Sequence, residues 1–193
     1  KKVYASNYDV ENIIINENFN KDFKKEEVFD KAFELAFDQL INSAAKWYYM
    51  FGSKISVPIT IRLILGRGWG QGPTHSQNLQ SWFAHIPGLK VVSPSNAFDA
   101  KGLLIASIFD PSPVIFLEHR WLHNSRSQVS EQLFKIELGK AKVVRSGVDI
   151  TIVTSSYLVP EALDAASYLF NEFDISSEVI DLRTIKPLDY ESI

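Results

Sequence analysis

The amino-acid sequence predicts an α/β protein in which helices cover both faces of a parallel sheet. Three apolar, largely β-branched segments, at residues 57–65, 89–92 and 114–117, alternate with segments of helical periodicity. Strands that are apolar along their whole length are typical of parallel sheets covered on both faces, and alternation of strand and helix is typical of this class. The 193 residues are enough for one core, or for one core and a smaller unit.

The first helix is predicted over residues 29–51, where apolar side chains recur at spacings of three and four. Residues 57–65 then form a buried strand. This strand leads into a loop, GRGWGQGP, whose four glycines give a backbone that can bend sharply and approach a ligand closely. The sequence therefore places a strand end, a loop and the following residues at one edge of the sheet.

A short helix over residues 77–85 and a short strand over 89–92 follow the loop, separated by Pro87-Gly88. Ser95 or Asn96 is predicted to cap the next helix, which continues to about Phe109. A strand over residues 114–117 completes this region, which the sequence predicts to be one unit over residues 31–117.

Residues 118–135 are polar and irregular, and are predicted to be a linker to a second unit over residues 136–193. In that unit, a strand over 149–154, a helix over 160–170 and a strand over 175–182 form one right-handed crossover. One crossover does not complete a sheet, so we expect this unit to be the first part of a larger α/β domain. Residues 1–30 are rich in Lys, Asn and Glu, contain no glycine or proline, and form a divergent N-terminal segment.

Composition excludes several classes of function. The formal net charge of −3 argues against a nucleic-acid-binding role that depends on a basic surface. No apolar run approaches the roughly 20 residues needed to cross a bilayer, and the N-terminus is too polar for a signal peptide. We therefore expect no membrane partner, and a location in the cytoplasm or in an organelle matrix. The absence of cysteine excludes thiolate metal sites and cysteine nucleophiles.

His75 is the candidate catalytic residue. It follows the last loop glycine by three positions, and its neighbours Thr74, Ser76 and Gln77 are able to fix its tautomer by hydrogen bonding. Histidine is the usual side chain for proton transfer near neutral pH. The alternative is a helix-capping histidine without chemistry. The glycine loop matches no nucleotide-binding pattern, so a loop that frames a cleft is favoured over a phosphate cradle.

Four stretches, in order, carry a resemblance: FDQLINSAAKWYYM, the block around GPTHSQNLQSWFAHIPGLKVVSP, PVIFLEHRWLH, and VIDLRTIKPLD. They resemble the β subunit of thiamine-diphosphate-dependent 2-oxoacid dehydrogenases of the pyruvate and acetoin types, and more widely transketolases. The resemblance covers the chain from about Phe33 onward. It implies a pyrimidine-binding-type domain followed by the start of a transketolase C-terminal-type domain.

The resemblance also implies site residues. The histidine that matches His75 lies in the active-site cleft of the family. Phe33 would contact the aminopyrimidine ring of the cofactor, although an aromatic at helical spacing is more often a core residue. Ile108, Asp110 and Ser112 match a turn that binds a monovalent cation, potassium, through oxygen ligands. The alternative for Asp110 is that it ends a helix.

The activity implied is oxidative decarboxylation of pyruvate or another small 2-oxoacid. Thiamine diphosphate and its magnesium would be held mainly by an α-type subunit in an α2β2 heterotetramer, which would serve the acyltransferase core of a dehydrogenase complex. The family's activating glutamate has no clear match, because the nearest acid at that distance is Glu11 and no glycine surrounds it. Two alternatives therefore stay open: an incomplete subunit with an assembly role, and a transketolase-like transferase.

Overall fold

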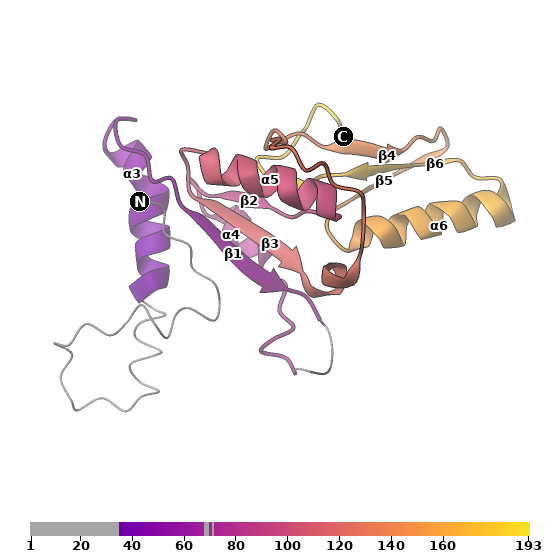
Figure 1. The fold of residues 1–193 in the computed structure, drawn as a ribbon, viewed down its shortest axis with the longest axis horizontal. Coiled ribbons are helices and arrows are strands. Elements are labelled where there is room, and N and C mark those ends of the chain that lie inside the picture. The colour runs from indigo at the N-terminus through magenta and orange to yellow at the C-terminus, as the bar shows by residue number, and fades with distance from the viewer. Residues whose placement is uncertain (1–34, 68–69, 71) are drawn as a thin grey trace.

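The structure, a computed structural model, describes residues 35–67, 70 and 72–193. These residues contain two sheets, with strand orders β1-β3-β2-β7 and β4-β6-β5. Figure 1 shows the two sheets one after the other along the length of the molecule, with α5 lying over the first and α6 against the second. The predicted fold class is confirmed.

Parallel strands form the centre of the first sheet. They are β1 (Thr60–Leu65), β3 (Val114–His119) and β2 (Lys90–Val92), with β3 between the other two. The strand predicted over residues 57–65 begins only at Thr60, because the N–H of Ile59 donates to the carbonyl of Val57 in a local turn. The strand predicted over residues 114–117 is longer than expected and ends at His119.

Helices pack on both faces of this sheet. On one face lie the π-helical η1 (Gln39–Ala44), its continuation α3 (Ala45–Met50), and α4 (Gln80–His85). On the other lies α5 (Ala97–Phe109). The part of the predicted 29–51 helix before residue 35 lies outside the described residues.

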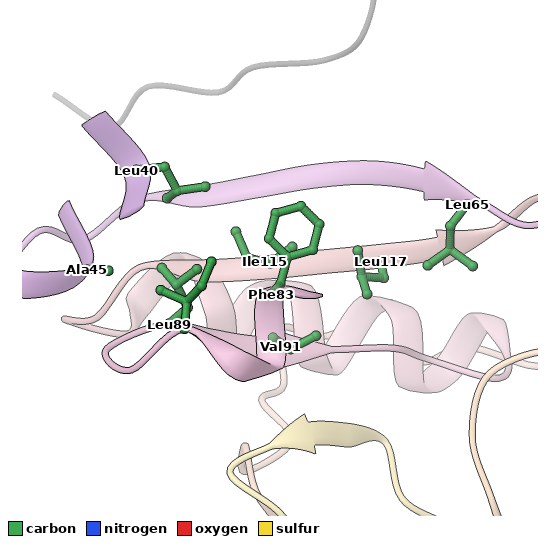
Figure 2. Close-up of a cluster of buried hydrophobic side chains, with 9 residues drawn as sticks. Leu40, Ala45, Leu65, Phe83, Leu89, Val91, Ile115 and Leu117 are labelled. Atoms are coloured by element: carbon green, nitrogen blue, oxygen red, sulfur yellow. The ribbon is translucent and has the colours of Figure 1, made fainter. Parts of the chain in front are cut away.

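Alternate side chains of β3 supply the two cores. Ile115 and Leu117 pack with Phe83 of α4 in a cluster that Figure 2 shows between β1, β2, β3 and the first helix. Phe116, on the opposite face, packs with Leu103 of α5. Ile115, Phe116 and Leu117 of β3 and Leu103 of α5 are almost completely buried. This alternation is the expected consequence of the two-residue period of a strand covered on both sides.

The second sheet consists of β4 (Lys142–Arg145), β6 (Ser177–Asp181) and β5 (Ile150–Thr154), with β5 and β6 parallel and β4 antiparallel. The connection from β5 to β6 is α6 (Leu158–Phe173), as the sequence predicts. Ala162 and Ala166 of α6 pack on Val179 of β6. The short β4 was not predicted, because its four residues lie at a sheet edge and show no buried alternation.

The connection between the units is held against α5 rather than loose. After η2 (Arg120–Asn124), a short 3-10 helix, the chain returns along α5. The Ile136 N–H donates to the Gly102 carbonyl at 3.1 Å, and Phe134 stacks on Phe98 with ring centroids 4.5 Å apart. A Cβ at Gly102 would lie 2.6 Å from both Phe134 and Ile136, so only glycine permits this approach.

A cluster of polar groups, here called the junction latch, joins the units: the buried Ser95, Asp99 and Asp181, and the partly buried Arg183. The Arg183 guanidinium lies 2.7 Å from the Asp99 carboxylate, and the Arg183 backbone N–H donates to Asp181 at 2.9 Å. Ser95 donates its hydroxyl hydrogen to the other Asp181 oxygen at 2.5 Å. Burial raises the pKa of Asp181, and the nearby charge of Asp99 raises it further.

After the latch, the chain enters the first sheet. β7 (Thr184–Lys186) pairs antiparallel with β2, which the sequence reading missed because the strand has only three residues. Lys186 donates to the carbonyls of Ala84 and Ile86 at the end of α4, both at 2.9 Å. Burial lowers the pKa of Lys186. A segment that follows the second sheet in sequence therefore completes the first.

Within the part of the chain that the structure describes, none of the helices combines the length and the apolar character that a bilayer crossing needs.

The turn before β2 is predicted to tolerate only glycine at position 88. Gly88 has a φ of 94°, and a Cβ there would lie 1.8 Å from the Ala45 carbonyl oxygen. We expect Gly88→Ala to lower the free energy of unfolding by about 3 kcal/mol, because backbone strain and a clash add. Gly52→Ala is the matched control: its φ is 60° but the space around it is open, so about 1 kcal/mol is expected. The free energies of unfolding would be measured by urea denaturation. An equal loss for Gly88→Ala and Gly52→Ala would contradict the close contact between Gly88 and the Ala45 carbonyl.

The Asp181 carboxyl is predicted to make stability fall as pH rises. Because its folded pKa is raised, the folded chain holds the proton more tightly, and stability is lost from the unfolded value near 4 upward through the folded pKa. Asp181→Asn should therefore gain stability relative to wild type as pH rises across this range, measured by urea denaturation. Asp189→Asn should show the opposite trend, because hydrogen bonds from Ser192 and from the Ala141 N–H lower the pKa of Asp189. A pH-independent difference for Asp181→Asn would contradict the burial argument.

Candidate active site

The carboxyl ends of β1 and β3 lie side by side, with Leu65 paired to His119. β1 continues into Gly66, which has a φ of 86°. A Cβ at Gly66 would lie 2.1 Å from Nε2 of His119, so only glycine lets the imidazole lie over this backbone. The Gly66 N–H donates to the Gln77 carbonyl at 2.9 Å, which ties together the two ends of the loop.

His75 lies in this loop, is exposed, and lines a cleft of about 280 Å³. Phe37 from the first helix and Trp82 from α4 line the same cleft and stack on each other, with ring centroids 4.5 Å apart and planes 11° apart. Arg120, directly after β3, lines it as well. The structure thus brings a histidine, two stacked aromatic rings and an arginine together from four parts of the chain.

The neighbours of His75 bond to the loop backbone. The Ser76 hydroxyl donates to the Gly72 carbonyl at 2.7 Å, and the Gln77 amide donates to the Thr74 carbonyl at 3.4 Å. Both bonds are internal to the segment that carries the imidazole, so these side chains shape the loop. The catalytic role of His75 stays a prediction.

Sequence reasoning missed Trp82 and Arg120. A signal for Arg120 was present, because it follows a buried parallel strand and ligands bind outside the carboxyl ends of such strands. Trp82 carried no comparable signal, since an aromatic on a short helix is usually a core residue. The predicted cofactor contact Phe33 lies outside the described residues, whereas Phe37, four residues later, does line the cleft.

The predicted cation site at Ile108, Asp110 and Ser112 lies at the end of α5, away from this cleft. Asp110 accepts from the Lys90 ammonium at 2.6 Å through one oxygen and from the Ser112 N–H at 2.8 Å through the other. Its charge is already neutralised, so a cation here would depend on backbone carbonyls. Among the residues that the structure describes, no three His, Asp or Glu side chains gather as a metal site. The potassium site stays a prediction.

His119, the last residue of β3, is buried. Its ring stacks on Tyr157 of the second unit at 4.8 Å, and its Nδ1 accepts the Trp121 N–H at 3.3 Å. Burial lowers the pKa of His119, and the positive charge of Arg67 lowers it further. The lowered pKa favours the neutral imidazole, and because Nδ1 accepts the Trp121 N–H, the neutral ring carries its proton on Nε2.

Known proteins resemble this chain in sequence and in fold. A "Pyruvate dehydrogenase E1 component subunit beta" from Rickettsia conorii is 48% identical, over 82% of this chain and 48% of that protein. An "Acetoin:2,6-dichlorophenolindophenol oxidoreductase subunit beta" from Cupriavidus necator is 47% identical, over 82% of this chain and 47% of that protein. The chain thus spans about half the length of the curated relatives it matches.

A solved structure described as "Split gene transketolase, inactive beta4 tetramer" has the same fold, with a TM-score of 0.65 and 24% identity over 83% of this chain and 49% of that one. Residues 28–125 match the family "Transketolase, pyrimidine binding domain", and residues 139–193 match "Transketolase, C-terminal domain". The chain therefore belongs to the transketolase family, with a pyrimidine-binding domain that precedes a transketolase C-terminal domain.

Proposed function

We propose that this chain is a β-type subunit of a thiamine-diphosphate-dependent 2-oxoacid dehydrogenase and supplies one wall of its active site. The observation that carries the proposal is the cleft at the ends of β1 and β3, where His75, Arg120 and the stacked pair Phe37 and Trp82 meet. Relatives at 47% and 48% identity are named as β subunits of an acetoin oxidoreductase and of a pyruvate dehydrogenase E1 component.

The apolar part of the cleft fits a flat heteroaromatic ring. Phe37 and Trp82 present aromatic surface, and Leu63 and Phe83 close the cleft behind them. Stacking against such surface favours a flat ring, and the surrounding apolar side chains exclude water. Phe37 and Trp82 are therefore the residues that would hold the aminopyrimidine ring of thiamine diphosphate.

The polar part of the cleft fits a small 2-oxoacid. The Arg120 guanidinium would bind the substrate carboxylate, since guanidinium groups pair well with carboxylates. The exposed His75 imidazole would orient the substrate carbonyl and hold or release a proton there. The bound cofactor supplies the carbanion chemistry. Pyruvate carries the carboxylate that this pairing needs, whereas acetoin is a neutral hydroxyketone that would bind through its carbonyl at His75 alone; both are candidate substrates.

The remaining parts of the site belong to a partner in this proposal. The sequence contains no Gly-Asp-Gly followed by Asn, the pattern that holds the diphosphate and magnesium in the family, so an α-type subunit would supply both. The resemblance to these β subunits also implies an α2β2 heterotetramer that serves an acyltransferase core, in the cytoplasm or in an organelle matrix. The potassium predicted near Asp110 would have a structural role.

The alternative is a subunit kept only for assembly. The end of the first helix favours a subunit contact, because Trp47, Tyr48, Tyr49 and Met50 are all exposed, Tyr49 by 88%. Large exposed apolar patches mark interaction surfaces. Both the enzyme and the assembly role need such a contact, so activity must discriminate between them.

The chain is to be co-expressed with the α-type subunit of the same organism and assayed with thiamine diphosphate, magnesium and either pyruvate or acetoin. We expect His75→Ala to lower kcat by about 100-fold or more, the usual contribution of a positioned acid-base group, while cofactor affinity changes little. His123→Ala is the control, because His123 is exposed and pairs with Glu118 instead of lining this cleft.

Turnover unchanged in His75→Ala would contradict the role of the imidazole. A stable complex that binds the cofactor but turns over neither substrate would favour the assembly role.

A further inference from the structure

A second cavity, of about 330 Å³, lies on the other side of the strand ends. Its walls come from the carboxyl ends of four strands: His119 is the last residue of β3, and Arg67, Ser93 and Ser156 follow β1, β2 and β5. Of the described residues that line it, only Leu65 also lines the His75 cleft. The crevice outside the carboxyl ends of parallel strands is the usual ligand position in α/β proteins. This cavity has that position between the two units.

Most of the described residues that line this cavity have polar side chains, none of them acidic, although apolar atoms make up more of the wall surface than polar atoms do. Arg67 is its cation, and hydroxyl, amide and imidazole groups make up most of the rest. The other polar lining residues are Ser76, Asn78, Gln80, Ser155 and Tyr157. Such a wall offers hydrogen-bond donors and positive charge, which complement anionic oxygens.

Two oxygens in this wall are buried without a hydrogen-bond partner: Oγ of Ser156 and Oε1 of Gln80. Ser156 is only 8% exposed. Buried polar side chains almost always have partners, and leaving one without a partner is costly. The hydroxyl can donate to an acceptor, whereas the amide oxygen can only accept. A ligand that satisfies both therefore needs an acceptor and a donor.

The backbone conformation at Ser156 and Tyr157 favours the binding of an anion. Ser156 has a φ of 56°, and Tyr157, with φ −58° and ψ −28°, begins the turn into the 16-residue helix α6. When a residue in the left-handed helical region is followed by one in the right-handed helical region, their backbone N–H groups point to the same side. Together they form a concavity that binds anions. The N-terminal end of a helix also carries a partial positive charge. Both effects act at the same wall as the unpartnered hydroxyl.

We propose that this cavity binds a small phosphate ester that carries a hydroxyl group. The phosphate accepts hydrogen bonds from the Ser156 hydroxyl and from the backbone N–H groups of Ser156 and Tyr157, just before α6, and lies within reach of the Arg67 charge. The ligand hydroxyl donates to Gln80. The cavity is at the small end of ligand-site volumes, which limits the ligand to a compact one. This site is separate from the proposed dehydrogenase chemistry, and binding to it does not depend on that chemistry.

Calorimetric titration of the full chain tests the proposal with glycerol 3-phosphate, inorganic phosphate and glycerol as probes. We expect saturable binding of glycerol 3-phosphate, weaker binding of phosphate, and none of glycerol. Ser156→Ala should weaken glycerol 3-phosphate binding about tenfold, the effect of one hydrogen bond to a charged group. Ser177→Ala should leave it unchanged, because Ser177 also has a buried hydroxyl without a partner but does not line the cavity.

Arg67→Gln should weaken binding of both phosphate probes, whereas Arg62→Gln, at an exposed arginine paired with Glu118, should not. Thiamine diphosphate should not displace glycerol 3-phosphate. No saturable binding by the folded wild-type chain overturns the proposal. Equal binding by wild type and Ser156→Ala shows an adventitious ion only, and displacement by thiamine diphosphate shows that the phosphate belongs to the cofactor site; either result overturns it as well.

Discussion

The arrangement of both cavities depends on one buried ion pair, between Asp99 at the start of α5 and Arg183 in the turn after β6. The carboxylate and the guanidinium are 2.7 Å apart, and their side chains are 1% and 12% exposed. A charge buried in this way is stable only with its partner, so α5 and the turn have to meet. Asp181, held by Ser95 and by the Arg183 N–H, extends the contact.

This ion pair affects the position of segments both after and before Arg183 in the sequence. Downstream, Arg183 leads directly into β7, which completes the first sheet and lets Lys186 bond to the last carbonyls of α4. Upstream, the second unit is held so that Tyr157 stacks on His119 at the end of β3. His75 and its aromatic neighbours form a cleft on one side of these strand ends, and Ser156 and Arg67 line a cavity on the other. The strand ends of the first sheet therefore border two cavities with different lining chemistry, and the second unit supplies part of the wall of one of them.

Local rules predicted those parts of the structure that local forces determine. The α5 cap was predicted at Ser95 or Asn96 and lies at Asn96. The cap and the strands on either side of α5 could be predicted because apolar periodicity and capping depend on residues close together in sequence. β7 could not, since three residues form a strand only when β2 is already beside them. His75 was identified from its glycine loop, but its companions Trp82 and Arg120 come from separate elements and meet only in three dimensions. The segment VIDLRTIKPLD was recognised by resemblance, but its role in the junction latch depends on Asp99, 84 residues earlier in the chain, and is visible only in the folded chain.

A double-mutant cycle on Asp99 and Arg183 tests the central claim most directly. The free energy of unfolding would be measured for wild type, Asp99→Asn, Arg183→Met and the double variant, with the exposed pair Arg62 and Glu118 as a matched cycle. The account predicts a coupling of about 2 kcal/mol or more for the buried pair, because each single variant leaves a buried partner uncompensated. For the exposed pair it predicts less than about 1 kcal/mol. A coupling near zero between Asp99 and Arg183 would contradict the claim that this ion pair holds the two units together.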